Sequence, residues 1–127
     1  MAFYLGLASR AKLIGVHPEL AAVVKRAITI TTVDFKVLEG LRTEGRQLEL
    51  YRAGATKTMN SRHLSGHAVD LGALVDGQVR WDWPLYNVIA EAMKQAAAEL
   101  HTPIEWGGDW KTFKDGPHFQ LPRGIYP

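Results

Sequence analysis

The sequence predicts an α+β fold, in which helices pack on one side of a small, mostly antiparallel sheet. Two segments repeat apolar residues at helical spacing, several short runs have the length and composition of strands, and Asp76-Gly77 is typical of a tight hairpin turn. With 127 residues, 46% of them hydrophobic and 22% charged, the chain is long enough for one core and short of two. We therefore expect a single domain over residues 1–127.

Four helices are expected from start and stop signals and from apolar periodicity. Ser9 is a candidate cap for a short first helix, and Pro18 suits the first position of a second one. Thr43 is expected to cap a third helix, which runs to residue 51 or 52 and is closed by Gly54. Pro84 begins the main helix. Its apolar stripe comprises Leu85, Val88, Ile89, Ala92, Met93, Ala96 and Leu100.

Five strands are expected between and after these helices. Their ranges are residues 34–39, 68–74, 78–81, 104–106 and 117–121. The second strand is predicted to be buried and to carry Asp70, and the last one bears His118. Residues 55–62 read as a polar loop. This arrangement places Asp70 and His118 on adjacent strands of the sheet.

The most informative segment is residues 61–70, Ser-Arg-His-Leu-Ser-Gly-His-Ala-Val-Asp. Its His63 and Asp70 are seven residues apart, which corresponds to roughly 23 Å along a strand and to about 10.5 Å along a helix. Neither separation lets both side chains reach one ion that lies about 2 Å from each. If they share an ion, the chain must fold back between them, and Gly66 is the residue able to take the unusual dihedral angles.

A second informative segment is Asp115-Gly116-Pro117-His118. With His63 and Asp70, His118 completes a set of two imidazoles and one carboxylate, which suits a catalytic zinc ion. Such sites keep one position for water, whose pKa the metal lowers to roughly 7. Asp115 is placed where a general base is wanted. The alternative, that His63 and Asp70 are unrelated surface and strand-end residues, is disfavoured by this second segment.

These segments resemble the motifs of the D-Ala-D-Ala metallopeptidase group. That group includes peptidoglycan-cleaving carboxypeptidases and dipeptidases and the L-alanyl-D-glutamate endopeptidases of bacteriophage endolysins, and this short chain is most similar to the last branch. The resemblance implies a hedgehog/DD-peptidase fold. The matching patterns are Ser61-x-His63-x-x-Gly66-x-Ala68-x-Asp70, Trp106-Gly107-Gly108-x-Trp110, Asp115-x-x-His118-Phe119 and Gly40-Leu41-Arg42-Thr43 with Gln47 and Tyr51.

The resemblance implies that one zinc ion is held by His63, Asp70 and His118. Asp115 would be the general base, and Arg42 would stabilise the negative charge that develops on the scissile carbonyl. Many relatives have Glu at the base position, whereas the endolysin branch resembles this sequence in having Asp. Candidate substrate contacts are Ser61, Gln47 and Tyr51 by resemblance, and Trp106 and Trp110 as walls of the cleft.

Several other residues are expected to have structural roles. His17 suits a helix start, and His101 is expected to interact with the carboxyl end of the main helix. Trp81 and Trp83 are predicted to be core or helix-packing groups. Two candidates for a role at the site are Glu105, which could orient a ligand, and His67, which lies inside the first motif.

The function that the resemblance implies is a zinc-dependent peptidoglycan endopeptidase, a phage-type endolysin that cuts the L-alanyl-D-glutamate bond of the stem peptide. One alternative is a D-alanyl-D-alanine carboxypeptidase or dipeptidase. Another is a non-catalytic, zinc-containing module that binds cell-wall peptide, against which the presence of both Asp115 and Arg42 argues. A nucleic-acid binder is disfavoured, because the net charge is only +2 and the 15 Lys and Arg residues form no run.

Composition also bears on where such an enzyme acts. The chain has no Cys, which excludes disulfides, thiolate zinc ligands and a Cys nucleophile. The apolar residues 2–8 lack a basic region and no signal peptide is expected, while Glu91, Lys94 and Glu99 in the main helix argue against membrane insertion. An endolysin of this kind is expected to be a monomer in the host bacterial cytoplasm. It would reach peptidoglycan in the periplasm after release by a separate membrane-permeabilising factor.

Overall fold

The sheet is organised around β2 (Ala68–Val75), which pairs antiparallel with three other strands. In the computed structural model, which describes residues 2–127, β1 (Asp34–Glu39) lies along one edge of β2, while β3 (Gln78–Arg80) and β5 (His118–Gln120) share the other. β4 (Glu105–Trp106) pairs with β5. β2 is largely buried, which explains its nearly continuous apolar sequence.

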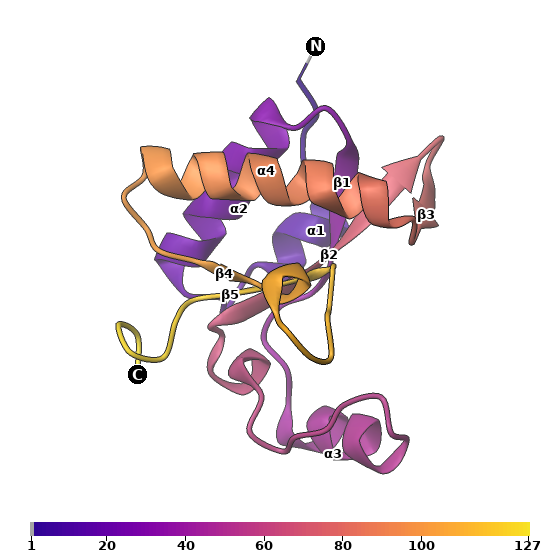
Figure 1. The fold of residues 1–127 in the computed structure, drawn as a ribbon, viewed down its shortest axis with the longest axis vertical. Coiled ribbons are helices and arrows are strands. Elements are labelled where there is room, and N and C mark those ends of the chain that lie inside the picture. The colour runs from indigo at the N-terminus through magenta and orange to yellow at the C-terminus, as the bar shows by residue number, and fades with distance from the viewer. Residues whose placement is uncertain (1) are drawn as a thin grey trace.

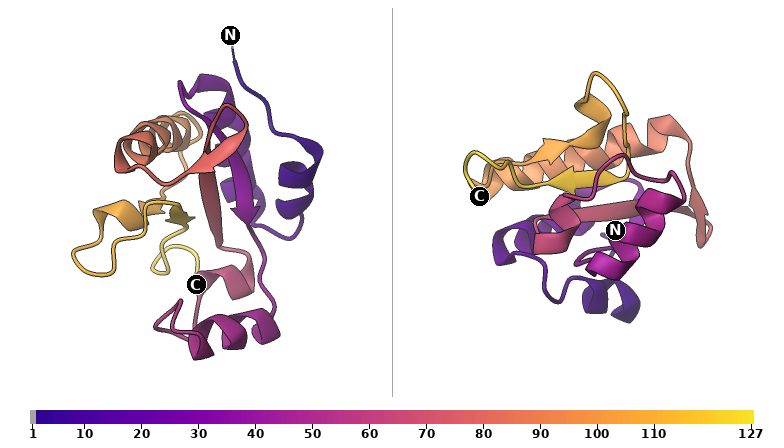
Figure 2. Two further views of the ribbon diagram at one scale, coloured as in Figure 1. Left: turned by 90° about the vertical axis from the view of Figure 1, so that its right-hand side faces the viewer. Right: turned by 90° about the horizontal axis from the view of Figure 1, so that it is seen from below.

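Four α-helices accompany this sheet among the described residues. α2 (Pro18–Ile30) and α4 (Trp83–Glu99) pack against each other, and the shorter α1 (Leu7–Lys12) packs against β1. α3 (Glu44–Arg52) and the loop that follows it stand at one end of the molecule, beyond the sheet (Figures 1 and 2). The largest fully buried core side chains are Phe35, Phe119, Leu20, Leu71, Ile89, Met93 and Leu121.

Local sequence signals determine where most elements begin and end. Pro18 opens α2, preceded by His17, whose Nδ1 accepts a hydrogen bond from the Glu19 main-chain N–H. Thr43 caps α3 by accepting from the Arg46 N–H. The β2–β3 turn holds Asp76 at φ 52° and Gly77 at φ 77°, the left-handed conformations that a two-residue hairpin loop needs. The α+β class, the antiparallel sheet and these boundaries are confirmed.

The structure corrects one expectation for an individual residue and decides between the two forms of another. Ser9 is not a helix cap but lies inside α1, where its buried Oγ accepts a hydrogen bond from the Val37 N–H at 3.0 Å. Neither Trp81 nor Trp83 is in the core, since their exposed fractions are 61% and 47%. The helix-packing alternative is confirmed, because Trp81 stacks on Tyr86 of α4, and Trp83, itself in α4, lies edge-on to Trp106. The first residue of α4 is Trp83, one position before the predicted start.

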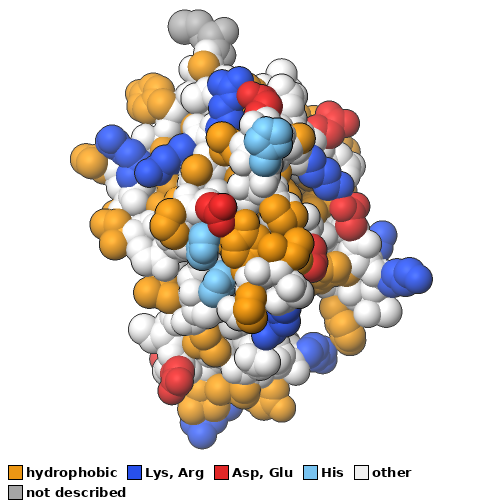
Figure 3. All heavy atoms as spheres, turned by 90° about the vertical axis from the view of Figure 1, so that its left-hand side faces the viewer, with side chains coloured by type: hydrophobic (Ala, Val, Ile, Leu, Met, Phe, Trp, Pro, Cys, Tyr) orange, Lys and Arg blue, Asp and Glu red, His pale blue; other side chains and the backbone are white. Residues whose placement is uncertain are grey.

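The surface has mixed character. The face drawn in Figure 3 shows basic and acidic side chains scattered between apolar ones, without a broad area of one sign. No helix among residues 2–127 combines the length and the apolar character needed to cross a bilayer.

Candidate metal centre and active-site cleft

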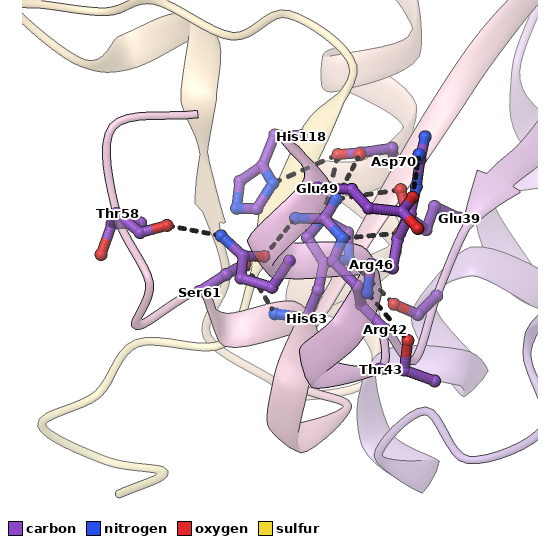
Figure 4. A network of polar contacts seen from close by, with 12 residues as sticks. Glu39, Arg42, Thr43, Arg46, Glu49, Thr58, Ser61, His63, Asp70 and His118 are labelled. Atoms are coloured by element: carbon purple, nitrogen blue, oxygen red, sulfur yellow. Dashed lines mark hydrogen bonds and ion pairs between the residues drawn. The ribbon is translucent and has the colours of Figure 1, made fainter. Parts of the chain in front are cut away.

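Three side chains from separate segments converge at one point. His63 lies in a short 3-10 helix (Arg62–Ser65), Asp70 in β2 and His118 in β5. Asp70 Oδ1 is 3.3 Å from His63 Nε2 and 3.2 Å from His118 Nδ1, and one donor atom of each residue lies within 4.8 Å of the others (Figure 4). The convergence predicted from the two sequence segments is therefore present.

The chain folds back between His63 and Asp70 as their spacing requires. Ser61 caps the 3-10 helix by accepting a hydrogen bond from the His63 N–H, and Gly66 ends it with a φ of 74°. A Cβ on Gly66 would collide with the carbonyl oxygen of Gly15. Gly66 thus supplies both the left-handed conformation and the close approach of two chain segments.

The two imidazoles are oriented by partners on their other nitrogens. His63 Nδ1 donates to the Gly40 carbonyl oxygen at 2.8 Å, which directs Nε2 at Asp70. His118 Nε2 lies 2.8 Å from Gln120 Oε1, and the Gln120 amide in turn donates to Glu105. Glu105 therefore contacts His118 only indirectly, through Gln120. Gln120 was not among the residues predicted from the sequence to belong to the site. The sequence did indicate Gln120, because it lies two positions after His118 on the same predicted strand, and residues two apart on a strand share a face.

Asp70 and His118 are electrostatically coupled. Burial raises the pKa of Asp70, but hydrogen bonds from His118 and His63 and their charges outweigh it, so its pKa lies well below the ordinary value. Burial lowers the pKa of His118, yet the hydrogen bond and the negative charge of Asp70 raise it above the ordinary value overall. Without a metal ion, this contact therefore stabilises a proton on the His118 nitrogen that faces Asp70.

The donor set fits a zinc ion. In its neutral form each imidazole donates its single N–H to the protein oxygen on the side away from Asp70, which leaves the nitrogen facing Asp70 with a lone pair for a metal ion. Two nitrogens and a carboxylate oxygen are the ligands of catalytic zinc sites, and His118 opens onto a cavity on its remaining side. The two imidazoles are buried and Asp70 is half-buried, and all three line the cavity from which water would reach the ion.

Arg42 borders the metal cluster but is already surrounded by polar partners. Its Nε and Nη2 bond the two carboxylate oxygens of Glu39 at 2.6 and 2.9 Å, and Nη2 lies 3.7 Å from Asp70 Oδ2. Its main-chain N–H donates to the His63 carbonyl, which ties the arginine to the 3-10 helix. Figure 4 shows the guanidinium between Glu39 and Asp70. The arginine is thereby held in one orientation.

Gln47 is a hydrogen-bond partner of the Arg42 guanidinium. It is fully buried, its Oε1 accepts from Arg42 Nη1 at 2.8 Å, and its Nε2 donates to the Thr58 carbonyl at 2.5 Å. Both ends of the amide are therefore occupied inside the protein. Gln47 therefore links Arg42 to the loop after α3 and does not line the cavity, unlike the predicted substrate contacts Ser61 and Trp110.

Asp115 reaches the site on a turn between β4 and β5. Its N–H donates to the Gly107 carbonyl, and a Cβ at Gly107 would collide with the Asp115 carbonyl oxygen, so glycine is required for this approach. Burial and the negative charge of Asp70 raise the pKa of Asp115, although His118, His63 and Arg42 oppose the shift. A carboxylate with a raised pKa is a stronger base than a free aspartate.

A cavity of about 520 Å³ opens onto these groups. Ser61 and Trp110 line it, and the Trp110 ring lies 5.2 Å from the His118 ring. Tyr51 is exposed on α3 and does not line the cavity, and Trp106 is buried with its indole N–H donating to the Gly116 carbonyl. The structure thus brings the predicted metal ligands, Arg42, Asp115, Ser61 and Trp110 together, but not Tyr51 or Trp106. His67, which is hydrogen bonded to the Ser65 hydroxyl, also lies outside the cavity.

Comparisons with known proteins agree with this geometry. Residues 1–121 match the family model of the phage L-alanyl-D-glutamate peptidase. The L-alanyl-D-glutamate peptidase of Escherichia phage T5 is 30% identical over 130 residues, which cover 99% of this chain and 94% of that protein. The peptidoglycan L-alanyl-D-glutamate endopeptidase CwlK of Bacillus subtilis is 32% identical over 121 residues, covering 83% and 72%.

Two solved structures are similar in fold. The crystal structure of the Serratia marcescens L-Ala D-Glu endopeptidase ChiX has a TM-score of 0.91 at 50% identity, covering 97% of this chain and 93% of that one. The D,D-dipeptidase VanXYg has a TM-score of 0.54 at 18% identity, covering 84% and 50%, and this likeness concerns the fold alone.

The fold and the site define a class, the peptidases built on the D-Ala-D-Ala metallopeptidase fold. Within that class, the chain belongs to the phage L-alanyl-D-glutamate peptidase family. The family resemblance read from the sequence is therefore confirmed.

Proposed function

We propose that the chain is a zinc-dependent peptidoglycan endopeptidase that hydrolyses the L-alanyl-D-glutamate bond of the bacterial stem peptide. The observation that carries the proposal is the meeting of His63, Asp70 and His118 in one cavity with Asp115 and Arg42. The names of the relatives in the family supply the bond that is cut. One zinc ion, held by the two imidazoles and the Asp70 carboxylate, would activate water and polarise the scissile carbonyl.

In this proposal Asp115 moves the protons of the reaction. Its carboxylate accepts a proton from the attacking water and returns it to the nitrogen of the leaving amine. Partial burial and the nearby Asp70 charge raise its pKa above the ordinary value, which makes the carboxylate a stronger base. Gly107 allows the backbone of Asp115 to approach the site.

Arg42 would act on the charge that develops on the carbonyl oxygen. Its guanidinium is held by Glu39 and Gln47 before substrate arrives, so little reorganisation is needed during the reaction. Glu39 and Asp70 offset part of its charge. Removal of one such donor typically lowers the rate by about 10²–10³.

The proposal extends to the setting of the enzyme. The substrate is the peptidoglycan stem peptide, and the working unit is a monomeric single domain that acts in the periplasm of a bacterial host. Access from the cytoplasm requires a separate membrane-permeabilising factor. No role in nucleic-acid binding is proposed, in keeping with the mixed charges of the surface (Figure 3).

Digestion of purified muropeptides, analysed by mass spectrometry, tests the bond that is cut. Fragments that end in L-alanine and begin with D-glutamate are expected. Release of terminal D-alanine alone would identify a carboxypeptidase instead. Binding of muropeptides without any fragments would identify a non-catalytic wall-peptide module.

The Asp115→Asn variant tests the mechanism. The variant and the unmodified protein are both expected to bind one zinc ion per chain, while kcat/KM of the variant falls by about 10²–10⁴. Asp109→Asn is the matched control, because Asp109 pairs with Lys94 on the surface and does not line the cavity. Unchanged cleavage by Asp115→Asn would contradict the assigned role.

A further inference from the structure

Three arginines line the active-site cavity, and their surroundings differ. Arg42 is held by the Glu39 carboxylate and by Gln47, and it is the arginine assigned to the scissile carbonyl. Arg62 and Arg123 lie at another part of the wall, where the chain after β5 meets the 3-10 helix that carries His63. The function assigned so far uses neither of them.

Arg62 is a buried cation without a carboxylate partner among the described residues. Only 6% of its surface is exposed, and its Nη2 donates to the Leu121 and Tyr126 carbonyl oxygens at 2.9 and 2.6 Å. Its Nε is buried with no hydrogen-bond partner. The charge of Glu105 partly offsets the effect of burial on Arg62, but no carboxylate of the described residues forms an ion pair with it. A buried guanidinium without such a pair favours an anion nearby.

Arg123 presents its charge at the opening of the same wall. It is exposed, and its Nη2 donates to the Asn60 carbonyl at 2.7 Å, with no ion pair to a carboxylate in the described part of the chain. Its charge also lowers the pKa of Arg62, behind the larger effect of burial, so the two guanidinium groups are close enough to repel each other. The remaining N–H groups of Arg123 are free to bind a ligand.

The substrate of the proposed function carries an anion that fits this position. A glutamyl residue whose nitrogen lies in the scissile bond has two carboxyl groups. Extension of the stem peptide uses one of them, and the other remains a free carboxylate within a few bonds of that nitrogen. Such a carboxylate must lie in the cavity when the scissile carbonyl is at the metal cluster.

We propose that Arg123, with Arg62 behind it, binds the free carboxylate of the D-glutamyl residue and so determines specificity for an acidic residue after the scissile bond. This inference rests on the proposed function. The planar fork of Arg123 donates to the carboxylate, a charge-assisted contact that is among the stronger hydrogen bonds in proteins. The carboxylate in turn supplies the nearby counter-charge that Glu105, which forms no ion pair with Arg62, provides only in part.

Two synthetic stem peptides test this, identical except that the free D-glutamyl carboxylate of one is an amide in the other. We expect the unmodified, zinc-loaded enzyme to cut the acid with a kcat/KM about 10- to 100-fold above that for the amide. Arg123→Gln is expected to lose that preference by slower cleavage of the acid, with cleavage of the amide nearly unchanged. Arg123→Lys is expected to retain part of the preference.

Arg10→Gln is the matched control, because it removes the same charge from α1, outside the cavity. It should discriminate between the peptides as the unmodified enzyme does. Equal slowing of both peptides by Arg123→Gln would indicate that Arg123 only fastens Asn60, and would overturn the inference, as would equal cleavage of both by the unmodified enzyme. Cleavage of neither peptide would instead refute the proposed function, and the inference with it.

Discussion

Asp70 and His118 face each other across the β2–β5 pair, with Asp70 Oδ1 3.2 Å from His118 Nδ1. The two residues are 48 positions apart, yet the register of the sheet fixes their separation. Directly opposed residues on antiparallel strands project to the same face. Two of the three proposed metal ligands are therefore held in place by backbone hydrogen bonds.

Gln120 should contribute to zinc affinity although it does not touch the ion. It accepts the hydrogen bond from His118 Nε2 and so fixes the ring orientation. We expect Gln120→Ala to weaken zinc binding by about 10- to 100-fold without unfolding the protein, as for other groups that orient a ligand. Competition with a chromophoric chelator measures this. Gln78→Ala, on the exposed strand β3, should bind zinc normally.

Gln47 should matter for both stability and rate. Gln47→Ala leaves Arg42 Nη1 and the Thr58 carbonyl without their partner and opens a buried space. We expect a loss of about 1–3 kcal/mol in the free energy of unfolding and a fall in kcat/KM through misplacement of Arg42. Urea unfolding and peptide digestion measure the two effects. Gln95→Ala, at an exposed position of α4, should change neither, and parallel behaviour of the two variants would refute the positioning role.

The metal-free protein should lose stability as the pH rises above about 6.5. The pKa of His118 is raised in the folded protein, chiefly by Asp70 against the effect of burial. A raised pKa stabilises the fold fully below the ordinary value, and this contribution disappears as the pH rises through the folded value. Burial is the main cause that lowers the pKa of His67, so the titration of His67 changes stability only at pH values below this range.

Urea midpoints of the chelated protein across this pH range test the prediction. His118→Gln should flatten the profile, and His101→Gln, at an exposed position after α4, should not. Zinc affinity should rise over the same range, since zinc must displace the His118 proton. A flat profile for the chelated, unmodified protein would count against this coupling.

A comparison of Gly66 with Gly54 separates the cost of a left-handed backbone conformation from the cost of a steric collision. Both have positive φ, 74° and 76°, but only at Gly66 would a Cβ collide with another segment, at the Gly15 carbonyl oxygen. We expect Gly54→Ala to cost about 1 kcal/mol in stability. Gly66→Ala should cost clearly more and also weaken zinc binding, because Gly66 follows the 3-10 helix that carries His63. Similar thermal unfolding of the two variants would show that the collision is relieved at little cost.

Much of the fold was predictable because its signals are local. Pro18, Thr43 and the Asp76-Gly77 turn act within a few residues, and the limits of β1 coincide with the predicted ones. The fold-back at Gly66 followed from a distance argument alone. The convergence of His63, Asp70 and His118 was accessible because residue types and spacing restrict which groups can share an ion.

The polar contacts around the site were not predictable in the same way. α3 is polar overall, so no apolar periodicity indicates that Gln47 faces inward while Tyr51 faces solvent. The register shift between Val37 and Glu39 aligns Glu39 with Asp70, and a shift of one residue reverses which face a side chain takes. Such contacts depend on tertiary packing.

β2 carries the Asp70 carboxylate and is hydrogen bonded to three other strands, whereas another part of the cavity wall comes from the loop after α3. Mechanical stiffness is therefore distributed unevenly around the cavity. The strand that holds the Asp70 carboxylate is among the last parts to open by local fluctuation, whereas the loop joins the site through side-chain contacts such as that of Gln47 with Thr58.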